Sequence, residues 1–93
     1  MPSRRISNWY YVYVLFSKKD KEFYIGYTQN LKRRLKEHNT KKNQSTKSRT
    51  PLALIYAETC LNNEDAKRRE KYLKTTQGRR FLKLRLRKFL HNL

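Results

Sequence analysis

Hydrophobic and polar positions along the chain first divide into short runs that are typical of β-strands. The run from Trp9 to Phe16 is almost wholly aromatic, β-branched or leucine, which indicates a buried strand. A polar turn, Ser17 to Lys21, separates it from a second run, Phe23 to Thr28. Because this connection is short, we expect the two strands to form an antiparallel hairpin. Small and aliphatic residues from Leu52 to Thr59, just after Pro51, predict a third strand.

The segment between the second and third runs has a different pattern. Asn30 is a suitable N-cap for a helix from Leu31 to His38 or Asn39. The residues from Thr40 to Thr50 are polar and basic without a hydrophobic period, so we expect an exposed loop there.

Two further helices are predicted in the last third of the chain. Asn62 or Asn63 caps a helix that runs to about Lys74. Gly78 is expected to break the chain before a last helix, from Arg79 to about Leu90. Apolar residues at i, i+4, i+7 and i+11 form one face of that helix: Leu82, Leu86, Phe89 and Leu93. The order ββαβαα predicts a small mixed α/β fold, and 93 residues leave room for a single domain.

The charge of the chain indicates its partner. Lys and Arg number 24 against 7 Asp and Glu, a net charge of +17. Such a field attracts polyanions and drives binding through counterion release, so nucleic acid is the leading partner. A membrane surface or an acidic protein would be attracted by the same charge. No apolar run is long enough to span a bilayer and no signal-peptide pattern opens the chain, so we expect a cytoplasmic protein without a membrane partner.

Helical geometry separates the charged residues of the first helix. At about 100° per residue, Leu31, Leu35 and His38 share one face, and Arg34 lies at its edge. Arg33 points the opposite way, toward solvent. We therefore expect Arg34 to reach over the sheet and Arg33 to contact at most a distant phosphate.

Glu70 is the corresponding residue of the second helix. It is the only carboxylate in the last 28 residues and lies beside Ala66 and Leu73 on the expected buried face. A carboxylate at such an edge needs a metal, an arginine or a hydrogen-bond network as its partner. The alternative is an i,i+4 ion pair with Lys74, which would stabilise the helix by roughly 0.3–0.5 kcal/mol.

Taken together, these residues resemble a known family. Tyr11-Val12-Tyr13 and Tyr24-Ile25-Gly26, followed by Arg34, His38 and Glu70, resemble the GIY-YIG nuclease domain, most closely its small stand-alone bacterial members. The resemblance covers roughly residues 9–75. It implies an N-terminal tail at residues 1–8 and a basic C-terminal helix at residues 76–93, packed on the same domain. The family fold is a three-stranded antiparallel sheet flanked by helices.

The resemblance implies a metal-dependent endonuclease acting on DNA rather than RNA. Glu70 would bind one divalent cation, Mg²⁺ or Mn²⁺, and the metal and Arg34 would stabilise the charge that builds at the scissile phosphate. Tyr13 or Tyr24 would accept a proton from the attacking water, and the residues alone do not choose between them. An unperturbed tyrosine, with a pKa of about 10, is a poor base at neutral pH, so nearby positive charge is needed. His38 would orient that tyrosine or shuttle its proton.

Two positions depart from the family pattern. Tyr11 stands where many members have glycine, and Tyr27 stands where some carry a lysine that assists the tyrosine base. His38 is the nearest group that could serve in place of that lysine. Neither departure touches Arg34 or Glu70.

Basic residues outside the motif are expected to contact phosphates. Such contacts position a strand and carry little sequence information, so cleavage should be structure-directed or unspecific. A non-catalytic nucleic-acid-binding protein and an accessory subunit with a protein partner remain as alternatives. The phosphate-contacting set comprises the basic residues of the last helix together with Arg33, Lys41, Lys42, Lys47 and Arg49.

Overall fold

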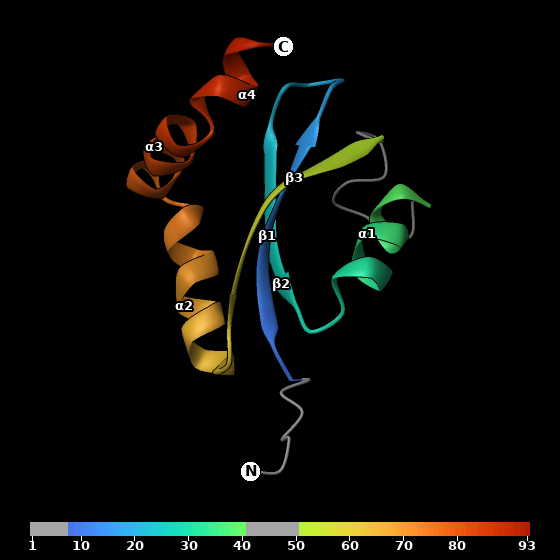
Figure 1. The fold of residues 1–93 in the computed structure, drawn as a ribbon, viewed down its shortest axis with the longest axis vertical. Helices are drawn as coiled ribbons and strands as arrows, with labels where there is room; N and C mark the ends of the chain where they lie inside the picture. Colours follow the sequence, from blue (N-terminus) through green and yellow to red (C-terminus); the bar gives the residue numbers. More distant parts are fainter. Residues whose placement is uncertain (1–7, 41–50) are drawn as a thin grey trace.

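The computed structural model describes residues 8–40 and 51–93 (Figure 1). Its elements, in chain order, are β1 (Tyr10–Ser17), β2 (Phe23–Thr28), α1 (Leu31–Asn39), β3 (Leu52–Cys60), α2 (Asn63–Leu73), α3 (Thr76–Arg85) and α4 (Arg87–His91). The predicted order ββαβαα is confirmed, with the last helix divided in two. The expected loop at 40–50 falls, apart from Thr40, outside the described residues, as do Lys41, Lys42, Lys47 and Arg49 of the predicted phosphate-contacting set.

The three strands form one antiparallel sheet in the order β2-β1-β3. Figure 1 shows the sheet close to edge-on, with α2 and α3 along one side and α1 along the other. The central strand β1 is therefore covered on both faces, which explains why its sequence is a nearly continuous hydrophobic run rather than an alternating one. The predicted three-stranded antiparallel sheet flanked by helices is confirmed.

Alternate side chains of β1 enter two separate hydrophobic clusters, one on each face. Tyr13 and Leu15 pack with Leu52, and with Leu31 and Leu35 of α1. The opposite face holds the larger cluster, which includes Val12, Val14, Phe16, Phe23, Ala66, Leu73 and Leu82. The sheet thus carries α1 on one cluster and the C-terminal helices on the other.

Asparagine caps begin the two helices that hold the predicted site residues. The Asn30 side chain accepts a hydrogen bond from the Arg33 N–H at 3.0 Å. Asn62, one of the two predicted caps of α2, accepts from the N–H groups of Glu64 and Asp65. Each cap satisfies N–H groups that have no partner inside the helix, so it fixes where the helix begins.

The expectation that Gly78 breaks the chain is wrong. Gly78 lies inside α3, and its N–H donates to the side chain of the N-cap, Thr75, at 3.1 Å. A Cβ atom at this position would come within 2.5 Å of the Leu73 Cα and closer still to the Tyr72 carbonyl oxygen. Glycine is therefore present because the end of α2 approaches α3 too closely for any side chain.

The expected single helix from Arg79 to Leu90 is also wrong. Leu86 has φ −107° and ψ 22°, which ends α3, and α4 follows directly. The resulting turn places Phe89 edge-to-face with Phe16 of β1, at 5.6 Å between ring centroids. Leu82 is fully buried as predicted, whereas Leu93 is exposed. Among the described residues, no helix has both the length and the hydropathy to cross a membrane.

Candidate active site

The five predicted site residues line one open cleft at the β2 edge of the sheet. Its volume is about 590 Å³. Tyr13 and Tyr24 face α1, whereas Glu70 comes from α2 on the opposite side of the sheet. Because no described strand lies beyond β2, the cleft can extend around this edge and bring both faces together. Its lining residues are Tyr13, Glu22, Phe23, Tyr24, Ile25, Gly26, Tyr27, Arg34, His38, Glu70, Lys74 and Arg79.

Gly26 allows the Tyr13 ring to lie across β2 toward the cleft. The two residues are direct partners in the antiparallel register of β1 and β2. A Cβ atom on Gly26 would come within 2.6 Å of the Tyr13 Cζ and nearer still to the hydroxyl oxygen. The glycine of the second motif thus makes room for the tyrosine of the first, which is a physical reason for the two motifs to occur together.

The Tyr13 hydroxyl lies between two polar groups of α1. Its oxygen is 3.2 Å from His38 Nε2 and accepts a hydrogen bond from Arg34 Nε at 3.3 Å. A phenol oxygen can accept from Arg34 and donate its own proton at the same time, so the Tyr13 hydroxyl can donate to His38 Nε2 in the tautomer whose proton is on Nδ1. Tyr13 and His38 are 3% and 4% exposed, so water competes little for these contacts.

Burial and charge keep His38 neutral. Loss of solvation on burial lowers the pKa of His38 below its usual 6.5, and the neighbouring Arg34 charge lowers it further. The carboxylate of Glu37 acts in the opposite direction on the pKa. The hydrogen bond to Tyr13, and next to it Glu37, raise the pKa of Arg34, so Arg34 stays a cation.

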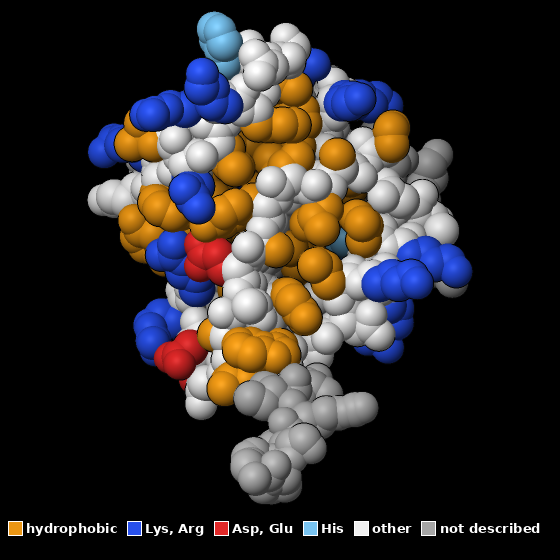
Figure 2. All heavy atoms as spheres, viewed as in Figure 1, with side chains coloured by type: hydrophobic (Ala, Val, Ile, Leu, Met, Phe, Trp, Pro, Cys, Tyr) orange, Lys and Arg blue, Asp and Glu red, His pale blue; other side chains and the backbone are white. Residues whose placement is uncertain are grey.

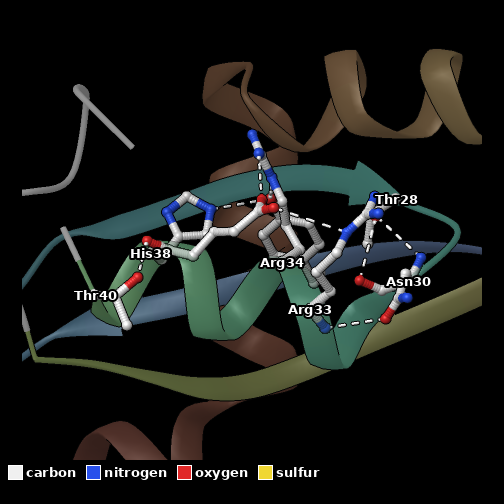
Figure 3. Close-up of polar contacts among 8 residues, drawn as sticks. Thr28, Asn30, Arg33, Arg34, His38 and Thr40 are labelled. Atoms are coloured by element: carbon white, nitrogen blue, oxygen red, sulfur yellow. Dashed lines mark hydrogen bonds and ion pairs between the residues drawn. The ribbon is translucent and has the colours of Figure 1, made fainter. Parts of the chain in front are cut away.

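Arg33 and Arg34 share the Glu37 carboxylate but differ in exposure. Arg34 Nη1 lies 3.1 Å from Glu37 Oε1, and Arg33 Nε lies 3.7 Å from Oε2 (Figure 3). The Arg33 side chain is 69% exposed and does not line the cleft, whereas the Arg34 side chain is 40% exposed and does. Among the described contacts, those of Arg34 engage only Nε and Nη1, which leaves further N–H groups for an anion in the cleft.

Tyr24 has a different neighbour. Its hydroxyl donates to Asp20 Oδ2 at 2.6 Å, across the β1–β2 turn. The two tyrosine hydroxyls thus have different partners: Tyr24 contacts a carboxylate, whereas Tyr13 contacts a histidine and an arginine.

Glu70 makes the ion pair with Lys74 that the sequence gives as the alternative to a metal, and it also faces the cleft. Its side chain is 19% exposed and lines the cleft, and Glu70 Oε2 lies 3.0 Å from Lys74 Nζ. Across the described part of the chain, no three His, Cys, Asp or Glu residues converge as a metal cage. The cleft is lined by two carboxylates, Glu70 and Glu22. A single carboxylate such as Glu70 in an open polar cleft suits Mg²⁺ or Mn²⁺, which retains waters and takes phosphate oxygens as ligands, and does not suit a closed zinc site.

Several lining residues are not among the predicted site residues. Tyr27, noted from the sequence only as standing where some family members carry a lysine, contacts the core and also lines the cleft near Glu70. Lys74 and Arg79 come from the C-terminal helices. The sequence predicts Lys74 as an ion-pair partner of Glu70 and Arg79 as one of the phosphate-contacting residues of the last helix, but it places neither in the cleft. Their positions depend on how α2 and α3 pack, which local sequence patterns do not show.

Cationic side chains border the sheet on both sides. In Figure 2, Lys and Arg gather over the helices at the left, top and right, whereas hydrophobic side chains occupy the middle of the view. Acidic side chains occur as a few isolated groups on this face. The flanking helices thus offer positive charge to a polyanion that crosses the molecule.

Several proteins with similar sequences, and one with a similar structure, carry the group name UPF0213. An UPF0213 protein of Staphylococcus haemolyticus is 38% identical over 76 residues, covering 81% of this chain and 92% of that protein. One of Oceanobacillus iheyensis is 38% identical over 81 residues, covering 86% and 91%. The solution NMR structure of the UPF0213 protein BH0048 from Bacillus halodurans has a TM-score of 0.51 at 32% identity, covering 80% of this chain and 81% of that one.

The family assignment comes from the whole domain. The model of the GIY-YIG catalytic domain matches residues 9–84, which include the cleft residues from β1 to α3. Nucleases with this domain act on nucleic acid and generally use divalent metals. The chain therefore belongs to the GIY-YIG catalytic domain family.

Proposed function

We propose that the protein is a divalent-metal-dependent endonuclease that hydrolyses phosphodiester bonds in DNA. The observation that carries the proposal is the Tyr13 hydroxyl, held between His38 Nε2 and Arg34 Nε in the cleft that Glu70 also lines. These contacts supply a proton acceptor, a cation and a carboxylate within one site.

Tyr13 is the general base in this proposal. The neutral His38 ring accepts the phenolic proton, and the Arg34 guanidinium stabilises negative charge on the phenol oxygen. The tyrosine oxygen can then take a proton from the attacking water. Tyr24, whose hydroxyl donates to Asp20, instead holds the β1–β2 turn at the end of the cleft.

Arg34 and Glu70 act on the phosphate. The remaining guanidinium N–H groups bind non-bridging oxygens and offset the charge that grows in the transition state. Glu70 would hold the metal ion, which when bound supplies Lewis-acid stabilisation of the phosphate and leaving oxygen. Lys74 forms an ion pair with Glu70 in this structure and would contact the same phosphate when substrate is bound.

Backbone phosphates, rather than bases, provide the main contacts. The cations around the cleft recognise phosphate, which has the same charge at every nucleotide. Cleavage is accordingly structure-directed or unspecific, with DNA as the substrate.

The test is a cleavage assay with purified protein on single-stranded, branched and duplex DNA and on RNA. We expect DNA cleavage with Mg²⁺ or Mn²⁺ and none with EDTA. Tyr13→Phe should lower the rate about a hundredfold or more, the scale for loss of a general base, whereas Tyr24→Phe should retain most activity. The reverse ranking of these matched variants would overturn the assignment of Tyr13.

Two outcomes of the assay would favour other functions. Binding without cleavage under every metal condition would indicate a non-catalytic nucleic-acid-binding protein. Cleavage that begins only when a second protein is added would indicate an accessory subunit.

A further inference from the structure

A second, smaller groove adjoins the candidate active site. Its volume is about 180 Å³, and it lies between the β1–β2 turn and the C-terminal helices. Figure 1 shows these helices beside that end of the sheet. The groove shares Glu22, Phe23 and Arg79 with the cleft, so the two hollows are adjacent. Its other lining residues are Lys21, Lys83 and Leu90.

Three cations face this groove against one carboxylate. Lys21, Arg79 and Lys83 come from two separate parts of the chain, the β1–β2 turn and α3. Within residues 8–40 and 51–93, none of the three has an ion-pair partner, whereas Arg34, Arg69 and Lys74 all do. Like charges around one hollow repel one another, so a bound anion would lower their energy.

The backbone at Lys21 gives independent support. Lys21 has φ 60°, and no other non-glycine residue among those described has positive φ. Its N–H donates to the Ser17 carbonyl at 2.8 Å, and the Ser17 N–H donates to the Glu22 carbonyl at 3.1 Å. Glycine or asparagine adopts this left-handed conformation more readily than lysine does. The lysine side chain, which lines the groove, adds a cation that those residues would not.

We propose that this groove binds a second backbone phosphate of the nucleic-acid strand whose scissile phosphate lies in the cleft. The inference rests on the proposed function, since it takes the strand in the cleft to be the substrate. Arg79 contacts the strand where the cleft meets the groove, and Lys21 and Lys83 bind the next phosphate along. Phe23 and Leu90 give the groove apolar surface for the sugar.

The first experiment measures binding alone. Affinity for a single-stranded oligonucleotide is titrated against salt in EDTA, for Lys21→Gln/Lys83→Gln and for a control, Lys19→Gln/Lys71→Gln. The control removes one lysine from the same turn and one from the C-terminal helices, and neither lines the groove. The groove variant should have a shallower slope of log K against log salt, by about 0.7 for each phosphate that it no longer binds, and the control should change the slope little. Equal changes of slope in both variants would overturn the proposal.

The second experiment compares substrates that extend past the scissile phosphate, on the 5′ or the 3′ side, with substrates that end beside it. The groove variant should cleave extended substrates of one polarity more slowly than wild type and short substrates equally fast. An equal effect on both lengths would contradict a second phosphate site. If no protein cleaves any substrate but the salt slopes differ as expected, the proposed function fails while the groove stands.

A third variant separates the side chain of Lys21 from its backbone. Lys21→Gly relieves the left-handed conformation and removes the cation, so the melting temperature should rise while affinity for the oligonucleotide falls. Unchanged affinity in this variant would show that Lys21 has no part in binding.

Discussion

At the scale of single residues, adjacent arginines on α1 provide the sharpest comparison. Arg34 donates to Tyr13 inside the cleft, whereas Arg33 is mostly exposed outside it. We expect Arg34→Ala to lower the cleavage rate by about a hundredfold or more, the usual scale for losing one preorganised charge, with affinity nearly intact. Arg33→Ala should instead cost a little affinity. Both are measured by single-turnover cleavage and by binding in EDTA, and equal effects would refute the role assigned to Arg34.

Substitution of Glu70 tests whether this residue is a metal ligand or only a helix-surface residue. As a ligand, Glu70→Ala should abolish Mg²⁺-dependent cleavage, while DNA affinity holds or rises because a negative charge leaves a basic cleft. Lys74→Ala is the matched control, because it breaks the same ion pair and keeps the carboxylate. Either variant should lower the free energy of unfolding by only about 0.3–0.5 kcal/mol. Cleavage assays and thermal melts, each with and without Mg²⁺, make the comparison; wild-type cleavage by Glu70→Ala would refute the proposed mechanism.

His38 predicts a dependence on pH. Its pKa is lowered in the folded protein by burial and then by Arg34, so the unfolded chain binds the proton more readily as the pH falls below about 6.5. Wild type should therefore lose stability as the pH falls through that value and regain it as the pH rises. His38→Gln lacks this component. Thermal melts of both proteins between about pH 5 and pH 8 test this prediction. Parallel curves of melting temperature against pH for wild type and His38→Gln would contradict it.

Protonation of His38 should also affect cleavage. An imidazolium has no free nitrogen to accept the Tyr13 proton, so the rate should fall on the acidic side of the same titration.

At the scale of elements, the junction of α2 and α3 depends on one missing side chain. Gly78→Ala should lower the free energy of unfolding by about 1–3 kcal/mol, because the methyl group would meet the backbone of Tyr72 and Leu73, which cannot move aside cheaply. Gln77→Ala, at an exposed neighbouring position of α3, is the control and should be nearly neutral. Urea unfolding of both variants measures the difference. Helix propensity alone predicts that Gly78→Ala would raise stability. If the variant is more stable than wild type, α2 and α3 can move apart without a loss of stability.

The same junction shows where prediction from sequence ends. Strands and caps depend on local chemistry, so β1, β2, β3 and the Asn30 cap could be predicted closely. The place of Gly78 could not be predicted, because its reason is the approach of another helix, which no pattern within α3 records. The turn at Leu86 is similar, since it serves a contact between Phe89 and Phe16, which are distant in sequence.

The candidate site divides in the same way. Helical spacing brought Arg34 and His38 to one side of α1 and Glu70 to the edge of α2, and the structure places all three in the cleft. The positions of Tyr27 and Arg79 in the cleft could not be predicted, because they arise where the cleft extends around β2 and meets α3. This part of the cleft forms only when helices have packed on both faces of the sheet.

At the scale of the whole molecule, charge and the site reinforce each other. The net charge is +17, and the helices on both sides of the sheet carry much of it. Most of the described cations do not line the cleft that holds the Tyr13 hydroxyl. Their effect is on association, since a polyanion is attracted to the whole surface before any one phosphate enters the cleft.

This division of roles predicts how binding and cleavage respond to salt. Each phosphate contact releases condensed counterions from the nucleic acid, so log K against log salt should have a slope on the order of −4 to −8 for several contacts. Once substrate is saturating, the cleavage rate itself should depend far less on salt, because Tyr13 and His38 are buried and screened little. Fluorescence anisotropy in EDTA and single-turnover cleavage in Mg²⁺, over the same salt series, measure the two quantities. Affinity that does not change across the salt series would exclude nucleic acid as the main partner, because salt weakens the attraction between a polyanion and so basic a surface.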